Sequence, residues 1–136
     1  MNQEFIPYEQ ALALKELGFD EPCFAEYRQW NGNKPWLQLY QDLSDCSTDP
    51  ADYEYTTECL APLYQQAFRW FREKYKMHII SPDFGSKFKY KIFNLHLLKQ
   101  GIEFEKTGFD TYEEAELACL IKLIEIVSTT PTKCYK

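Results

Sequence analysis

The chain has 136 residues, which is long enough to bury one hydrophobic core, and its 45% hydrophobic and 17% aromatic residues exclude a disordered chain. It is acidic, with 15 Lys and Arg against 21 Asp and Glu and a net charge of -6. Strong nucleic-acid binders usually carry the opposite balance because phosphate contacts require cations, so the composition argues against a nucleic-acid partner.

The cysteines and the first residues indicate a cytoplasmic protein. The five cysteines are odd in number and none forms a Cys-x-x-Cys pair, which favours reduced thiols. The start of the chain is polar and lacks Lys and Arg, so we expect no signal peptide. No run of about 18 apolar residues occurs, so we expect no membrane association.

The N-terminal part predicts a helix followed by a hairpin. Residues 7–18 have helical spacing of apolar residues and end at Gly18, a typical residue after a helix. A strand is expected over 23–30, and the Asn31-Gly32 dipeptide favours a tight turn. The return strand, 36–40, places Trp36, Gln38 and Tyr40 on one face.

The middle of the chain predicts a long loop, a helix and a short strand. Residues 42–57 are polar and acidic, and a loop of this length is either functional or simply mobile. Apolar residues at helical spacing predict a helix over 60–75. Residues 77–81 are expected to form a strand that ends before Pro82.

Two further strands are expected over 87–93 and 102–105. The first alternates strictly, with Lys87, Lys89 and Lys91 on the outward face. If the strands pair, these lysines lie near outward glutamates of the second strand, which makes the lysine row a feature of the sheet surface rather than a phosphate track.

The last predicted helix, 111–127, begins with a capping box formed by Thr111 and Glu114. Its apolar residues span about 200° of the helix surface, whereas a surface helix needs little more than about 100°. They form two rows: Leu117, Leu120, Ile124 and Val127, and Ala115, Cys119, Leu123 and Ile126. The sheet is expected to cover one row. The other row is covered either by the helix at 60–75 or by another subunit. Leu117, Leu120, Ile124 and Val127 are therefore candidate interface residues of a homo-oligomer.

The predicted order is helix, two strands, helix, three strands, helix. The connections are too short for parallel crossovers, so we expect an α+β fold. An antiparallel sheet, made of a hairpin and a three-stranded meander, would pack against the helices in a single domain over 1–136.

No constellation of catalytic or metal-binding residues stands out. The two histidines, His78 and His96, have no ligand partners at metal-binding spacing. The sequence has no nucleophile elbow and no phosphate-binding glycine loop. We therefore predict no metal, no cofactor and no catalytic residue, although a site assembled in space stays open.

The C-terminal half has the element order of a double-stranded RNA-binding domain. Such domains place lysines at the start of the last helix to meet phosphates. Glu113, Glu114 and Glu116 occupy that position here, which argues against RNA binding in that mode.

Four residues are candidates for binding. Trp30 and Trp36 flank the predicted hairpin turn and either form a binding surface or pack as a cross-strand pair. Arg69 and Arg72 point away from the apolar side of the helix at 60–75 and could contribute cations to a nucleotide site.

Three blocks, residues 8–24, 61–75 and 111–127, together resemble a family of small uncharacterised proteins encoded by phages and prophages of Bacteroidota. The resemblance implies a phage gene product in the bacterial cytoplasm, and it carries over no catalytic residue. It favours a non-catalytic accessory protein that binds a host factor and inhibits a host defence system. One alternative is a sponge that sequesters a nucleotide or another small ligand at an oligomer interface. Another is a small hydrolase or nuclease.

Overall fold

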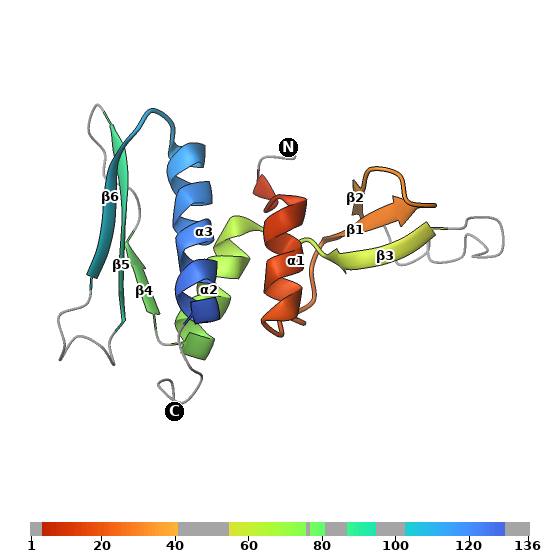
Figure 1. Cartoon of the computed structure of the whole chain (residues 1–136), viewed down its shortest axis with the longest axis horizontal. Coiled ribbons are helices and arrows are strands. Elements are labelled where there is room, and N and C mark those ends of the chain that lie inside the picture. The colour runs from red at the N-terminus through yellow and green to blue at the C-terminus, as the bar shows by residue number, and fades with distance from the viewer. Residues whose placement is uncertain (1–3, 41–54, 76, 81–86, 95–102, 130–136) are drawn as a thin grey trace. The chain divides into compact units, whose positions relative to one another are not determined.

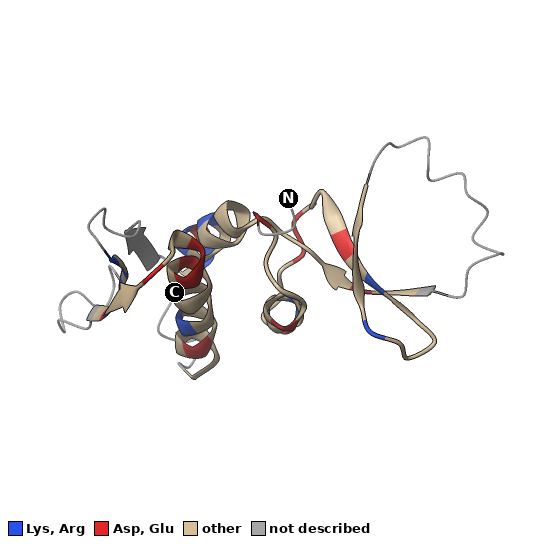
Figure 2. Cartoon of the chain, turned by 90° about the horizontal axis from the view of Figure 1, so that it is seen from above, with Lys and Arg blue, Asp and Glu red and all other residues tan. Residues whose placement is uncertain are grey.

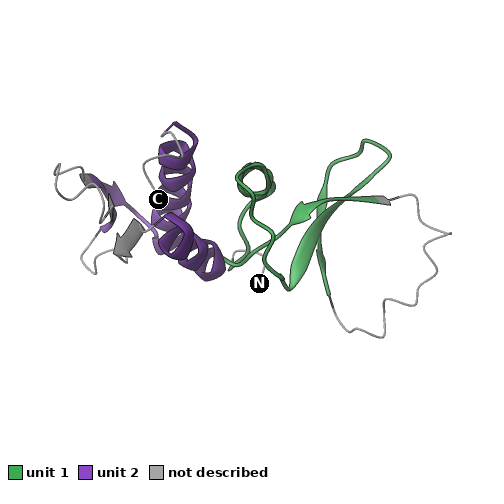
Figure 3. Ribbon diagram, turned by 90° about the horizontal axis from the view of Figure 1, so that it is seen from below, with its two compact units in different colours: residues 1–63 green, residues 64–136 purple. Residues whose placement is uncertain are grey.

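The computed structural model forms two compact units, unit 1 (residues 1–63) and unit 2 (residues 64–136), which Figure 3 distinguishes by colour. The structure describes residues 4–40, 55–75, 77–80, 87–94 and 103–129. The single domain expected from the sequence stays a prediction.

Unit 1 combines one helix with a three-stranded antiparallel sheet (Figure 1). The helix is α1 (Tyr8–Glu16), and the strands are β1 (Ala25–Trp30), β2 (Trp36–Leu39) and β3 (Tyr55–Leu60). The strand order is β2-β1-β3, so β1 is the central strand. α1 packs against β3.

The two turn signals of unit 1 act as the sequence predicts. Asn31 and Gly32 adopt φ angles of 43° and 78°, and the amide of Asn33 donates to the carbonyl of Trp30 at 2.8 Å. Positive φ at both central residues matches the right-handed twist of the flanking strands. At the end of α1, Gly18 has φ 98° and the amide of Phe19 bonds back to Leu14 at 3.0 Å, the bond that closes a Schellman motif.

Strand β3 corrects the prediction for residues 42–57. The sequence predicts a loop there and a helix from residue 60, whereas residues 55–60 pair with β1 and the helix begins at Tyr64. The pattern failed because a register shift between Tyr27 and Arg28 breaks the alternation along the β1–β3 pair, and tertiary pairing overrides the weak local signal. The rest of the predicted loop, residues 42–54, lies outside the described residues.

Unit 2 has the order helix, three strands, helix. Its elements are α2 (Tyr64–Tyr75), β4 (Met77–Ile80), β5 (Phe88–Asn94), β6 (Glu103–Phe109) and α3 (Tyr112–Thr129). The antiparallel order is β4-β5-β6; α3 packs against β5 and β6, and α2 packs against β4 and α3 (Figure 1). The α+β class with antiparallel pairing is therefore confirmed, but the described strands form two three-stranded sheets, and β3 adds a strand to the predicted order.

The capping box of α3 forms as expected. The amide of Glu114 donates to Thr111 Oγ1 at 3.2 Å, and the Glu114 carboxylate accepts from the Thr111 amide at 3.4 Å. The Lys89–Glu105 ion pair across β5 and β6, at 3.6 Å, likewise confirms the expected pairing of outward lysines with glutamates.

The apolar rows of α3 are covered to different degrees. All four residues of the row Ala115, Cys119, Leu123 and Ile126 are buried. In the other row Leu120 and Val127 are buried, and Leu117 and Ile124 are half-buried. Within unit 2, both α2 and the sheet pack against α3. This agrees with the expectation that the helix at 60–75 covers the side of the last helix that the sheet does not. The oligomer interface stays a prediction.

Candidate functional site

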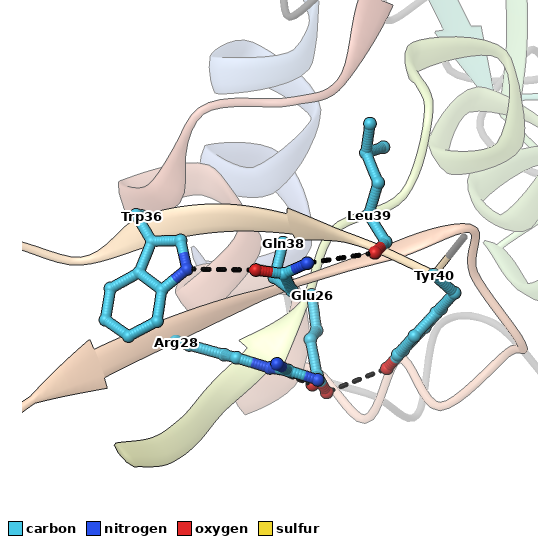
Figure 4. Close-up of polar contacts among 6 residues, drawn as sticks. All are labelled: Glu26, Arg28, Trp36, Gln38, Leu39 and Tyr40. Carbon is cyan, nitrogen blue, oxygen red and sulfur yellow. Dashed lines mark hydrogen bonds and ion pairs between the residues drawn. The ribbon is translucent and has the colours of Figure 1, made fainter. Parts of the chain in front are cut away.

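One face of the β1–β2 hairpin carries a group of aromatic and charged side chains. The register pairs Glu26 with Gln38 and Arg28 with Trp36, and cross-strand partners share a face. Tyr40 extends this face, since its hydroxyl reaches Glu26 (Figure 4). We call it the aromatic face, and it consists of Glu26, Arg28, Trp30, Trp36, Gln38 and Tyr40.

The opposite face of the sheet is covered by α1 and the segment before it. Tyr27, whose side chain alternates with those of Glu26 and Arg28, donates a hydrogen bond to the carbonyl of Ile6 at 2.7 Å. Its ring also meets that of Tyr8 edge to face, with centroids 5.4 Å apart. The one helix described in unit 1 thus lies on the Tyr27 side of the sheet.

A buried carboxylate anchors the aromatic face. Glu26 is 7% exposed, and both of its oxygens are engaged: Oε1 accepts from Arg28 Nε at 2.6 Å and Oε2 from the Tyr40 hydroxyl at 2.7 Å (Figure 4). Burial is the main cause that raises the pKa of Tyr40, and the bond to Glu26 raises it further. Tyr40 is therefore held as a neutral donor, and the charge of Glu26 is offset by Arg28.

The indole of Trp36 is also held in place. Trp36 Nε1 donates to Gln38 Oε1 at 3.3 Å, and Gln38 Nε2 donates to the Leu39 carbonyl at 3.2 Å (Figure 4). The polar edge of the ring is thereby bonded while its apolar surface stays partly accessible. Trp30 is 37% and Tyr40 47% exposed. Ordered aromatic side chains with exposed rings are typical of binding surfaces, because little side-chain entropy is lost on binding.

The structure brings only some of the predicted site residues together. Trp30 and Trp36 lie on the aromatic face, but the register places Trp36 opposite Arg28 rather than opposite Trp30. Arg69 and Arg72 lie on α2, where Arg69 is exposed and Arg72 half-buried. The tryptophans belong to unit 1 and the arginines to unit 2, and a nucleotide site that uses the arginines stays a prediction.

Four residues of the aromatic face were not among the predicted site residues: Glu26, Arg28, Gln38 and Tyr40. The alternation of Trp36, Gln38 and Tyr40 gave part of the signal. The remaining part is the alternation of Glu26 and Arg28, a carboxylate and a guanidinium two residues apart on a strand, which strand geometry places on the same side.

The two buried cysteines among the described residues, Cys59 and Cys119, are poor nucleophiles. Burial raises the pKa of the Cys59 thiol to about 11 and that of Cys119 to about 12, so both are neutral near pH 7. Within the described residues, no group of three or more His, Cys, Asp or Glu could hold a metal ion. The His78 side chain and all of His96 lie outside the described part of the structure.

Comparisons with known proteins add no relative: no protein family, curated protein or solved structure matches the chain. The resemblance to the phage family therefore stays a prediction. Of the helices that the structure describes, none is sufficiently long and apolar to cross a lipid bilayer.

Proposed function

We propose that the protein is a non-catalytic binding protein whose partner contacts the aromatic face of unit 1. The observation that carries the proposal is the set of polar contacts that fixes Trp36 and Tyr40 while their rings remain accessible. Preorganised aromatic side chains contribute strongly to binding because they bury large areas while few side-chain torsions have to be ordered.

The buried carboxylate supports a structural rather than a catalytic role. A general base needs a free oxygen within reach of a substrate proton. Both oxygens of Glu26 instead accept hydrogen bonds from Arg28 and Tyr40. The acidic group of the aromatic face thus serves to position its neighbours.

The identity of the partner is proposed from the family resemblance. A phage accessory protein in a bacterial cytoplasm would act on a host protein, and we propose that binding inhibits a host defence system. The aromatic face supports the binding step of this proposal, and the resemblance alone supports the choice of partner.

Photocrosslinking tests the binding step. Phe24 immediately precedes β1 and is 69% exposed. The photoreactive residue p-benzoylphenylalanine at this position therefore crosslinks to a partner that approaches the aromatic face. The matched control carries the same group at Ile121 on α3, which is 44% exposed and lies in unit 2. Both full-length variants are irradiated in a lysate of a Bacteroidota host.

We expect a discrete crosslinked host protein from position 24 but not from position 121. An excess of unlabelled wild-type protein should compete it away, and a Trp36→Ala variant should compete at least about fivefold less well. Equal crosslinking from both positions, or equal competition by the Trp36→Ala variant, would contradict binding at the aromatic face.

A further inference from the structure

The two units carry opposite net charges. Unit 1 contains three Lys and Arg against twelve Asp and Glu, a net charge of -9, whereas unit 2 contains twelve against nine, a net charge of +3. Figure 2 shows how the charged residues are distributed over the described elements. The overall charge of -6 is therefore unevenly distributed, and the acidic unit is the one that bears the aromatic face.

The few cations of unit 1 do little to offset this charge at the aromatic face. Arg28 donates to Glu26, so the pair adds no net charge. Lys15 donates to the Glu58 carbonyl at 2.7 Å. Its helix, α1, packs against β3 and covers the face of the sheet opposite the aromatic face. The third, Lys34, is an exposed residue after the hairpin turn. A ligand that approaches unit 1 therefore meets a net negative charge.

We propose that the aromatic face binds a basic protein segment, whose Arg or Lys side chains stack on the rings of Trp30, Trp36 and Tyr40. This inference rests on the proposed function and specifies the chemistry of its partner. The faces of aromatic rings carry negative charge density that attracts cations, and the net negative charge of unit 1 adds long-range attraction.

Contacts of the proposed kind already occur elsewhere in the chain. In unit 2 the Nζ of Lys74 lies 4.9 Å from the ring centre of Trp70, and the Nζ of Lys122 lies 4.9 Å from that of Phe104. These distances are within the range of about 6 Å in which cation–π attraction is significant. The aromatic face offers rings of the same chemistry to an external cation.

The charge of unit 1 disfavours the competing ligand classes. Nucleotides and single-stranded nucleic acids also stack on aromatic rings, but their phosphates require cations along the surface. The guanidinium beside Trp36 already donates its Nε to Glu26. The field that favours a basic segment thus opposes an anionic ligand at the same rings.

Fluorescence anisotropy with defined probes tests the chemistry on the full-length chain at 150 mM NaCl. The probes are fluorescein-labelled dodecapeptides of alternating Arg and Gly, or Glu and Gly, and a twelve-residue oligothymidylate. We expect binding of the Arg-Gly peptide alone. The Trp36→Leu variant, which keeps apolar volume but removes the ring, should weaken it at least about fivefold.

Two controls separate ring contacts from general attraction. The Trp30→Leu variant alters a more exposed ring, so it should weaken binding of the Arg-Gly peptide with little effect on folding. Thermal unfolding of the variant checks that the fold is kept. The double variant Glu9→Gln, Glu16→Gln removes two exposed charges from α1 and keeps the aromatic face intact, so it should change Kd less than either tryptophan variant. If it weakens binding as much as they do, attraction is non-specific and the inference is wrong.

The outcomes distinguish this inference from the proposed function. A crosslinked partner at position 24 with an acidic contact surface, or tighter binding of the Glu-Gly peptide or the oligothymidylate, would overturn the basic-segment inference and leave a binding role intact. Absence of any crosslinked partner at position 24 would overturn the proposed function itself.

Discussion

Glu26 is a carboxylate that the fold buries and pairs through both of its oxygens. Burial of a charge is costly unless it is paired and hydrogen-bonded. Arg28 comes from the same strand two residues later, and Tyr40 directly follows the neighbouring strand β2. The three side chains therefore tie the hairpin together at the point where the aromatic face is built.

Loss of the Arg28 side chain should destabilise the protein. In an Arg28→Ala variant the buried Glu26 keeps only its bond to Tyr40, and a hydrogen bond to a charged group contributes about 1.5–3 kcal/mol. We expect a loss of that size in the free energy of unfolding by urea titration. The matched control, Lys34→Ala at an exposed turn position, should change it by less than about 0.5 kcal/mol. Equal effects of the two variants would contradict the role of the pair.

Glu116 on α3 should make stability depend on pH. Burial, and secondarily the neighbouring Glu113, raise its pKa to about 6 from the ordinary 4.5. A raised folded-state pKa means that the stabilisation is complete below pH 4.5 and is lost as the pH rises through about 6. With solvent screening, the loss is on the order of 1 kcal/mol.

A Glu116→Gln variant removes this titration. The difference in unfolding free energy between variant and wild type should shift in favour of the variant between pH 4.5 and 6.5 and stay constant above. Glu113→Gln, on the exposed side of the same turn, is the comparison and should show a smaller shift. A pH-independent difference for Glu116→Gln would show that this carboxyl titrates normally.

At the scale of elements, α3 shows how local and tertiary signals agree. Its capping box satisfies amides at the N-terminus, and its apolar rows pack against β5, β6 and α2. Removal of an N-cap hydroxyl typically costs about 1 kcal/mol because a helix amide loses its acceptor.

A Thr111→Ala variant should therefore lower the free energy of unfolding by about 1 kcal/mol. The control, Ser128→Ala in the last turn of α3, removes an exposed hydroxyl and should have less than half that effect. Chemical denaturation of the two variants side by side measures both. A cap that contributes nothing would place the helix start elsewhere than at Thr111.

At the scale of the whole molecule, unit 2 contains its own helices, sheet and buried apolar residues. Phe71 of α2, Ile92 of β5 and Leu123 of α3 are all buried. A domain folds alone when one core serves all its elements. We expect a fragment of residues 64–136 to unfold cooperatively, with helical circular dichroism and a defined Tm. A fragment that shows no cooperative transition would mean that unit 2 depends on unit 1, in line with the single domain predicted from the sequence.

Much of the fold could be predicted because its signals are local. Asn31-Gly32 requires positive φ angles, the Thr111–Glu114 box needs only one helical turn, and the alternation of 87–93 is a property of a single strand. The site was predicted only in part. Trp30 and Trp36 stand out as residue types, whereas Glu26 and Tyr40 gain their roles from contacts between strands.

By itself, the sequence determined the α+β class, the turns and caps, and the acidic balance, since these depend on neighbouring residues or on composition. Tertiary structure decided the rest. Strand β3 exists because β1 offers it a ladder of backbone hydrogen bonds, which no local pattern encodes. The aromatic face exists because the register sets Trp36 opposite Arg28 and brings Tyr40 to a buried Glu26, and register is a property of paired strands.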